Sequence, residues 1–400
     1  MTFPRTLIAA LVAAGVAGSG SAAFAQESKV ALLGGITGPI AGMAPAMLAS
    51  MKLALDQVNQ AGGTSFGKII YQEFDDGCNP QVATDAMTKA VNVFGAAATV
   101  GPACSGALLA AVNSVSIPAG VLVASSSATS PKITELADKD LVFRTVPSDD
   151  FQGRALARTL LARGVKQVAV AYVNNDYGKG LAEAFKAEFE ASGGKITQFR
   201  GHEDKKASYR SDLAELAKGG ADTLVIFDYG NASGLTILRQ AIENGFFKQY
   251  VGADGMRDEN LIKTLGEANL KNFLVSAPVG EEGVAFQKFS EMARKAGVDP
   301  NATFAATSYD AAFLIALAME AAKGDKSKLP QALRAVATAP GEPILPGEWE
   351  KAKKLLAEGK EIDYKGAAGD HEFDKAGDVP GSYALFKVEG GTYKEVAKMK

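Results

Sequence analysis

The sequence predicts an α/β fold with parallel, doubly wound sheets in two domains. Short apolar runs typical of buried strands alternate with amphipathic helical patterns from Lys29 onward, which is the order of βαβ units. The alternation pauses at residues 144–147 and then resumes, so the two halves predict two similar sheets. The length of 400 residues also exceeds one ordinary core and favours two domains.

Strands and helices alternate regularly through the first half. Strands are expected at 30–36, 68–76 and 97–101, with a fourth that begins at Gly120. Between them, apolar residues at helical spacing predict helices over 47–58, from Pro80 to Phe94, and over 105–115.

In the second half, a helix capped by Asp149 or Asp150 extends to Arg163. Strands are then expected at 167–173, 196–199, 223–227, 250–252 and 273–277, alternating with helices at 177–190, 209–218 and 235–244. Four further helices are expected at 286–296, 305–323, 329–336 and 348–358, the last within a Pro-, Gly- and charge-rich stretch, 340–380. A hairpin of 382–388 and 393–396 closes the pattern.

Residues 1–25 are predicted to be a signal peptide. Arg5 supplies a positive start, residues 7–15 an apolar core, and Ala23-Phe24-Ala25 a cleavage site. That core is too short for a stable membrane span, and no Cys near the cleavage site could carry a lipid. We therefore expect a soluble periplasmic protein that is not lipid-anchored.

The composition argues against nucleic acid as a partner. The chain carries 42 Lys+Arg against 45 Asp+Glu, a net charge of −3 without a basic stripe. Only two cysteines occur, Cys78 and Cys104, and in an exported protein they predict one disulfide. The alternative is a pair of buried free thiols.

Polar side chains follow several predicted strands at their carboxyl ends, where ligands bind in open α/β sheets. They are Thr37, Ser105, Ser125 to Thr129, Tyr177, Tyr229 and Asp254. Two facing sheets would form a pocket from them, with hydroxyls and backbone N–H groups for an anion such as an α-carboxylate, and Asp254 for an ammonium group. Several of these residues have an alternative interpretation. Residues 125–129 could form a Ser-rich surface loop, Asp254 an Asp-Gly turn, and Tyr177 an aromatic residue at a helix start. For Phe304, a further aromatic candidate, the alternative is a plain core residue.

Signals for catalysis are weak, and we expect no enzyme, no catalytic residue, no metal and no cofactor. His202 and His371 lie in charged stretches and are expected at the surface, and no HExxH, GxSxG or Walker A motif occurs. The paired carboxylates Asp75-Asp76 and Asp149-Asp150 are expected to be a strand-end turn and a helix start.

The chain resembles the periplasmic solute-binding proteins of branched-chain (hydrophobic) amino-acid ABC transporters, over essentially the whole mature chain. The motifs that carry the resemblance are Gly38-Pro39 with Ala41, Asn-Gln-Ala-Gly-Gly at 59–63, Asp-Asp-Gly-Cys-Asn-Pro at 75–80, Gly101 to Ser105, Ser-Ala-Thr-Ser-Pro at 127–131, Phe143-Arg144-Thr145, Tyr177-Gly178, Gly252 to Gly255 and Tyr309-Asp310-Ala311. The resemblance implies the type I periplasmic binding fold and the Cys78–Cys104 disulfide.

This resemblance also implies two lobes joined by three crossovers, near Val146, Pro278 and 372–380, that close on the ligand like a clamp. Lobe 1 would comprise 26–146 with 279–372, and lobe 2 would comprise 147–278 with 373–400.

By position, the resemblance assigns ligand contacts to particular residues. Ser105 and Thr129 would bind the ligand carboxylate, while the Ser127 carbonyl and the Asp254 carboxylate would bind the amino group. The remaining candidates are Ala128 in the same loop, Tyr177, Tyr229 and Phe304 as pocket walls, and Met43. Two of these positions depart from the best-known leucine-type binders, which have Glu in place of Asp254 and an aromatic in place of Met43.

The expected function is capture of a small amino acid, branched-chain or otherwise aliphatic, by a monomer that delivers it to a membrane permease. The alternatives are a receptor of the same fold for another small polar solute, such as an amide or aromatic acid, a ligand-sensing module for a membrane receptor, and an exported enzyme.

Overall fold

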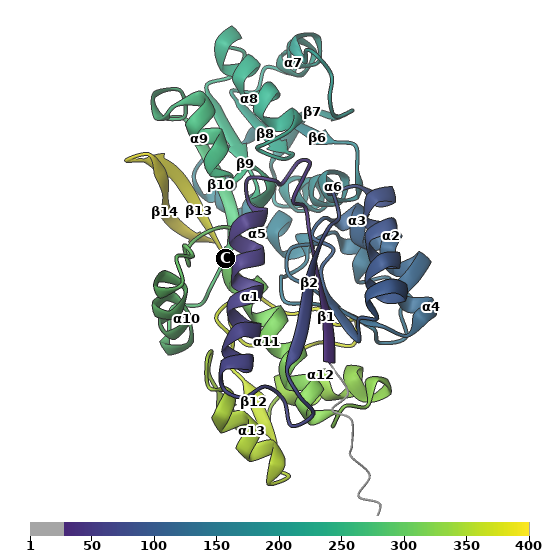
Figure 1. Cartoon of the computed structure of the whole chain (residues 1–400). Helices are drawn as coiled ribbons and strands as arrows, with labels where there is room; N and C mark the ends of the chain where they lie inside the picture. The colour runs from purple at the N-terminus through teal and green to yellow at the C-terminus, as the bar shows by residue number, and fades with distance from the viewer. Residues whose placement is uncertain (1–27, 400) are drawn as a thin grey trace, which may run out of the picture.

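The computed structural model describes residues 28–399, so the predicted signal peptide lies outside the described residues. Two separate sheets form the centres of two lobes, which Figure 1 shows one above the other. The chain passes between these sheets three times, after β5, after β10 and before β13. The predicted fold of two doubly wound lobes joined by three crossovers is therefore confirmed.

Lobe 1 is built on a parallel five-stranded sheet in the order β2-β1-β3-β4-β5. Residues 30–33 of β1 are completely buried, as expected for a central parallel strand that helices cover on both faces. The strands are β1 Ser28–Gly34, β2 Ile69–Asp75, β3 Ala98–Val100, β4 Leu122–Ser125 and β5 Val142–Arg144. Strand β5 was not predicted, because its three residues, Val-Phe-Arg, include a charged side chain and do not form an apolar run.

The helices of lobe 1 come from both ends of the chain. Helix α11 packs against α1 and the sheet, and it is buried all round because most of its residues are apolar and its few polar ones also face inward. The longer helices are α1 Ala44–Gln60, α2 Pro80–Thr88, α3 Ser105–Ala111, α10 Val284–Lys295, α11 Ala305–Ala321, α12 Leu329–Ala337 and α13 Trp349–Ala357, with a short turn α4 Ile117–Ala119. The stretch 340–380 also contains an unpredicted parallel pair, β11 Glu342–Ile344 and β12 Ile362–Tyr364.

Lobe 2 is built on a seven-stranded sheet in the order β14-β13-β10-β9-β8-β6-β7. Five strands are parallel, and the C-terminal hairpin adds two antiparallel strands at one edge. The strands are β6 Gln167–Val173, β7 Lys195–His202, β8 Thr223–Phe227, β9 Gln249–Gly252, β10 Phe273–Val279, β13 Ser382–Glu389 and β14 Thr392–Met399.

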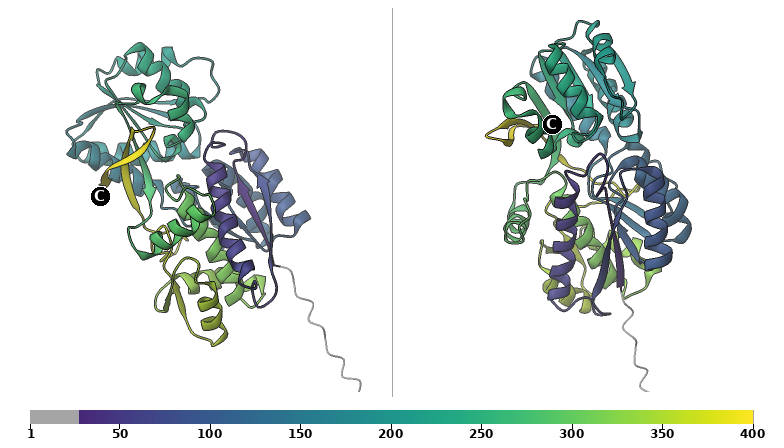
Figure 2. Two further views of the ribbon diagram at one scale, coloured as in Figure 1. Left: turned by 60° about the vertical axis from the view of Figure 1, so that its left-hand side comes forward. Right: turned by 45° about the horizontal axis from the view of Figure 1, so that its top comes forward.

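The helices of lobe 2 cover both faces of its sheet, as Figure 2 shows. They are α5 Asp149–Ala162, α6 Asp176–Ala191, α7 Arg210–Ala217, α8 Ser233–Asn244 and α9 Glu259–Leu265. Helix α9, with seven residues, was not predicted. The capping residue of α5 is Ser148, whose Oγ accepts from the Asp150 N–H, so the expected cap at Asp149 or Asp150 is wrong.

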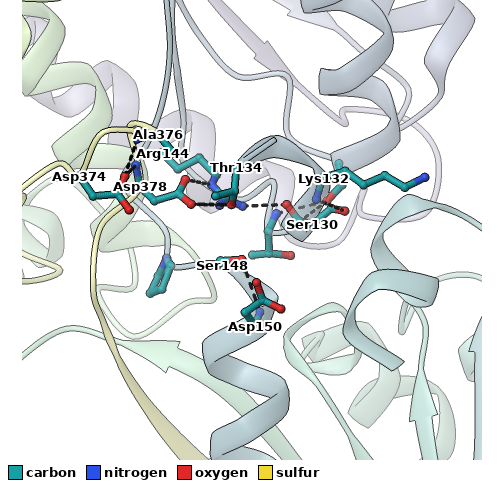
Figure 3. Close-up of polar contacts among 12 residues, drawn as sticks. Ser130, Lys132, Thr134, Arg144, Ser148, Asp150, Asp374, Ala376 and Asp378 are labelled. Carbon is teal, nitrogen blue, oxygen red and sulfur yellow. Dashed lines mark hydrogen bonds and ion pairs between the residues drawn. The ribbon is translucent and has the colours of Figure 1, made fainter. Parts of the chain in front are cut away.

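A buried ion pair ties the first crossover to the third (Figure 3). Arg144 is fully buried at the end of β5, and its Nε and Nη2 donate to the two carboxylate oxygens of Asp378 at 2.7 and 2.5 Å. Arg144 Nη1 also donates to the Ser130 carbonyl at 3.0 Å, in the loop after β4. Arg144 thus joins the first and third crossovers, where the lobes hinge, to the loop after β4 that carries the hydroxyls of Ser125 to Thr129.

Candidate functional site

A small pocket lies between the lobes, with about 310 Å³ of empty space that includes the part open to solvent. Loops at the carboxyl ends of strands in both sheets form its walls. Its lining residues are Ile40, Met43, Met47, Ala103, Cys104, Ser105, Ser127, Tyr177, Tyr229, Asp254, Gly255 and Phe304.

Lobe 1 contributes uncharged hydrogen-bonding groups. Ser105 is the first residue of α3, and its Oγ accepts from the N–H groups of Thr129 and Ser130 at 3.2 and 3.1 Å. Ser127 Oγ donates to the Ala103 carbonyl at 2.8 Å. These bonds join the loop after β4 to the loop after β3. The hydroxyl of Thr129 is buried and has no hydrogen-bond partner.

The disulfide supports this wall. Cys78 and Cys104 are joined, with their Cα atoms 5.2 Å apart, which confirms the predicted pairing. Asp76 is buried beside the bridge and accepts from the N–H groups of Cys78 and Ala103, both at 2.8 Å. The loop before Ser105 is therefore held by a covalent bond and a buried carboxylate.

Lobe 2 contributes a carboxylate and two aromatic rings. Asp254 is 2% exposed, and its Oδ1 accepts from the Tyr177 hydroxyl at 3.2 Å. The Tyr177 hydroxyl also accepts from the Gly255 N–H at 3.1 Å. A Cβ on Gly255 would lie 2.6 Å from the Asp228 carbonyl, so only glycine fits there. The Tyr177 and Tyr229 rings are tilted, with centroids 5.1 Å apart.

Burial raises the pKa of the Asp254 carboxyl to about 6, although the hydrogen bond from Tyr177 acts in the opposite direction. At neutral pH this carboxylate is therefore mostly ionised inside a buried pocket. Such a charge favours a cationic partner at hydrogen-bonding distance.

Asp149 is a second buried carboxylate near the pocket, and the sequence did not single it out as a site residue. Its N–H donates to the Thr129 carbonyl at 2.8 Å, and neither of its carboxylate oxygens has a hydrogen-bond partner. Burial and the charge of Asp254 raise the pKa of Asp149. The two neighbouring carboxyl groups therefore favour the state in which Asp149 is protonated and Asp254 is ionised. An Asp at a helix start is too common to signal this role.

Phe304 and Met43 close the apolar part of the pocket. Phe304 precedes α11 with a φ of +64°, a conformation that side chains rarely adopt, and its ring is largely buried. Met43 is buried at the start of α1.

Seven of the nine predicted ligand residues line one pocket, and two lie behind it. Ala128 is fully buried, and its N–H donates to Ser125 Oγ at 3.2 Å, while Thr129 lies beneath Ser105. Thr37, which also follows a strand, is exposed and donates to Asp75 Oδ2 at 2.6 Å, away from the pocket.

The expectation that both histidines lie at the surface is wrong. His202 Nε2 lies 2.6 Å from Asp228 Oδ2, and His371 Nε2 lies 3.6 Å from Asp310 Oδ2, with both rings buried. Their charged sequence neighbours face solvent while the rings pair with internal carboxylates, which a composition argument cannot detect. Among residues 28–399, no cluster of three or more His, Cys, Asp or Glu side chains is placed to share a metal ion.

The family model described as "receptor family ligand binding region" matches residues 46–391. A leucine-, isoleucine-, valine-, threonine- and alanine-binding protein of Pseudomonas aeruginosa is 32% identical over 82% of this chain and 87% of its own. Two solved structures share the fold. A leucine-binding protein LivK from Thermotoga maritima has a TM-score of 0.79 at 22% identity, covering 93% of this chain and 98% of its own.

The second structure is the branched-chain amino acid transporter substrate-binding protein LivJ from Streptococcus pneumoniae in complex with isoleucine. It has a TM-score of 0.78 at 24% identity, covering 93% of this chain and 100% of its own. Among the described residues, no helix is long and apolar enough to cross a membrane.

Proposed function

Because the chain belongs to the family described as "receptor family ligand binding region", we propose that it is the substrate-binding component of an ABC importer. It captures a small aliphatic amino acid between its lobes, with branched-chain amino acids foremost, and delivers it to a membrane permease. It binds and does not turn over its ligand. The 32% identical relative that binds leucine, isoleucine, valine, threonine and alanine supports this assignment.

The observation that carries the proposal is the buried Asp254 carboxylate opposite neutral donors on the other lobe. Asp254 binds the ligand ammonium with the Ser127 carbonyl, while Ser105 and the Ala128–Thr129 segment bind the ligand carboxylate. Asp149 adds a second acidic group behind Asp254. A zwitterion satisfies both walls at once, whereas a plain acid leaves Asp254 without a cation.

The aromatic and apolar walls select the side chain of the ligand. Tyr177, Tyr229, Phe304 and Met43 present rings and a thioether, which suit an aliphatic group of modest size. Closure of the lobes excludes water and strengthens the charged hydrogen bonds at the other end of the ligand. Thr129 lies behind Ser105, so its buried hydroxyl reaches the ligand carboxylate only by turning into the pocket, away from Asp149.

The lobe boundaries are part of the proposal, with one of the expected boundaries moved. Lobe 1 comprises 26–146 with 279–378, and lobe 2 comprises 147–278 with 379–400. The sheet that each flanking strand joins supports the first two crossovers. Hydrogen bonds from Arg144 and Thr134 to Asp378 support a third crossover after that residue rather than after residue 372. We further propose export through the segment 1–25 to the periplasm, where the protein acts as a monomer.

Isothermal calorimetry with the mature protein tests the function. The panel contains leucine, isoleucine, valine, threonine and alanine, with an aromatic acid and an aliphatic amide as alternative ligands. We expect the tightest binding for an aliphatic amino acid, and a melting temperature that rises with its concentration. Binding of the acid or the amide alone would replace this proposal with a receptor for another polar solute.

A further inference from the structure

We propose that Arg257 is a positioning residue that latches the two lobes around the ligand. The proposal rests on the proposed function, because it concerns how the same pocket is held closed. Arg257 follows the 3₁₀ turn Asp254–Met256 in lobe 2. Its partners lie immediately before Phe304 in lobe 1, so the latch joins two segments that each carry a pocket residue.

The guanidinium crosses from lobe 2 to lobe 1. Nη1 and Nη2 both donate to the Asn301 carbonyl at 3.0 Å, and Nη1 donates to Thr303 Oγ1 at 2.9 Å. Thr303 Oγ1 in turn donates to the Arg257 carbonyl at 2.9 Å. The two segments are thus joined by reciprocal hydrogen bonds, three of them with a charged donor, which makes them stronger than neutral ones.

Lobe 2 holds the guanidinium in place for this contact. Its central carbon lies 4.3 Å from the ring centroid of Phe386 and 5.5 Å from that of Tyr393, in the C-terminal hairpin. The Tyr393 hydroxyl donates to the Asp258 carbonyl at 3.0 Å, next to Arg257 in the chain. Because aromatic rings already support the side chain, less conformational entropy is lost when it meets lobe 1.

The segment of lobe 1 that Arg257 contacts ends at a residue with a strained backbone, Phe304. Phe304 has a φ of +64°, and Thr307 Oγ1 contacts the Phe304 carbonyl at 3.0 Å and the Ser126 carbonyl at 2.8 Å. Thr303 is fixed from lobe 2 by Arg257, so Phe304 is held over the pocket from both directions.

Because these contacts join the two lobes, opening must break them, and their loss should therefore accelerate opening. Ligand release becomes faster, whereas association, which begins with the open form, changes little. This split between the two rate constants separates a latch from a merely structural residue.

Stopped-flow binding of the best amino acid tests the latch with two matched sets. Arg257→Ala should raise the dissociation rate constant about tenfold, and Thr303→Val about threefold, with association rate constants within about twofold of wild type. Thr303→Ser keeps the hydroxyl and should retain the wild-type rate. Arg158→Ala removes an ion pair within lobe 2, 2.8 Å from Arg158 Nε to Glu188 Oε1, and should also leave release unchanged.

Melting temperatures of the unliganded variants show whether each one is folded. If Arg257→Ala does not fold, the Thr303→Val and Thr303→Ser pair decides. Wild-type release rates in the variants that remove the contacts, or equal rates for that pair, would overturn the latch alone. A wild-type protein that binds no amino acid would overturn the proposed function, and the latch with it.

Discussion

Asp254 destabilises the unliganded protein because its charge is buried without a cation. Burial raises its pKa to about 6, so at neutral pH the folded chain holds a carboxylate that an unfolded chain would leave in water. An ammonium group removes this penalty on binding. Asp254 therefore increases the affinity for the ligand and lowers the stability of the unliganded fold.

Replacing Asp254 with Asn should move binding and stability in opposite directions. The affinity for the best amino acid should fall about 10- to 100-fold, because a charged hydrogen bond is lost. The free energy of unfolding of the unliganded protein at pH 7 should rise by about 1–3 kcal/mol, because a buried charge is removed. Calorimetry and urea unfolding measure the two effects, and a loss of both affinity and stability would contradict this account.

The pH dependence of binding should also follow Asp254. The ammonium needs the ionised carboxylate, so affinity is complete above the raised pKa and falls as pH drops through about 6. At pH 5 the dissociation constant should be about tenfold larger than at pH 7.5. Asp254→Asn, assayed over the same range, should show a flatter profile. An unchanged wild-type affinity at pH 5 would argue against an ammonium at this position.

Breaking the Arg144–Asp378 ion pair, which joins two crossovers of the hinge, should strongly lower the free energy of unfolding. Arg144→Met leaves Asp378 buried without its cation and should lower the free energy of unfolding by about 3–5 kcal/mol. Arg144→Met with Asp378→Leu removes both charges and should recover most of that loss. Urea unfolding of the single and double variants measures this. Equal destabilisation in both would mean that the charge of Asp378 is not the cause.

At the scale of elements, periodic or continuously apolar segments were predictable, and short segments of mixed polarity were not. Helices α1 and α6 carry enough turns for a 3.6-residue pattern to emerge, whereas α11 is recognised by its long apolar run. Strands β5 and β11, with three residues each, are fixed by pairing with neighbours that are distant in sequence. The site followed the same rule. Residues just past strands were predictable, whereas Asp149 and the partners of Arg257 depend on how the lobes meet.

The disulfide joins the loop before α2 to the loop before α3. Cys78→Ala with Cys104→Ala opens a connection spanning 26 residues and should lower the free energy of unfolding by about 3 kcal/mol. Since Ser105 follows Cys104 directly, amino-acid affinity should also fall several-fold. Reducing agent should lower the stability of wild type toward that of the variant and leave the variant unchanged. A wild-type protein that is insensitive to full reduction would contradict this.

At the scale of the whole molecule, closure combines contacts of very different strength. Arg257 is supported by aromatic rings and donates to neutral acceptors of lobe 1 in a partly buried setting, whereas Lys132 meets the charged Asp176 across the lobes in a solvent-exposed one. Exposed ion pairs contribute little and are screened by salt, while partly buried hydrogen bonds to neutral acceptors are screened much less. The two kinds of contact should therefore differ in their response to ionic strength.

Lys132→Ala tests this difference. The Lys132 Nζ to Asp176 Oδ1 distance is 2.7 Å, with the Lys132 side chain 60% exposed, so its loss should raise the ligand dissociation rate only about twofold at low salt. In 1 M NaCl the variant and wild type should release ligand at the same rate, whereas Arg257→Ala should remain faster at both salt concentrations. Lys248→Ala, which breaks a 2.9 Å pair with Asp222 inside lobe 2, is the control and should match wild type throughout. If salt abolished the Arg257 effect as well, closure would depend on surface charge, and the hydrogen bonds from Arg257 to neutral acceptors would contribute nothing to holding the ligand.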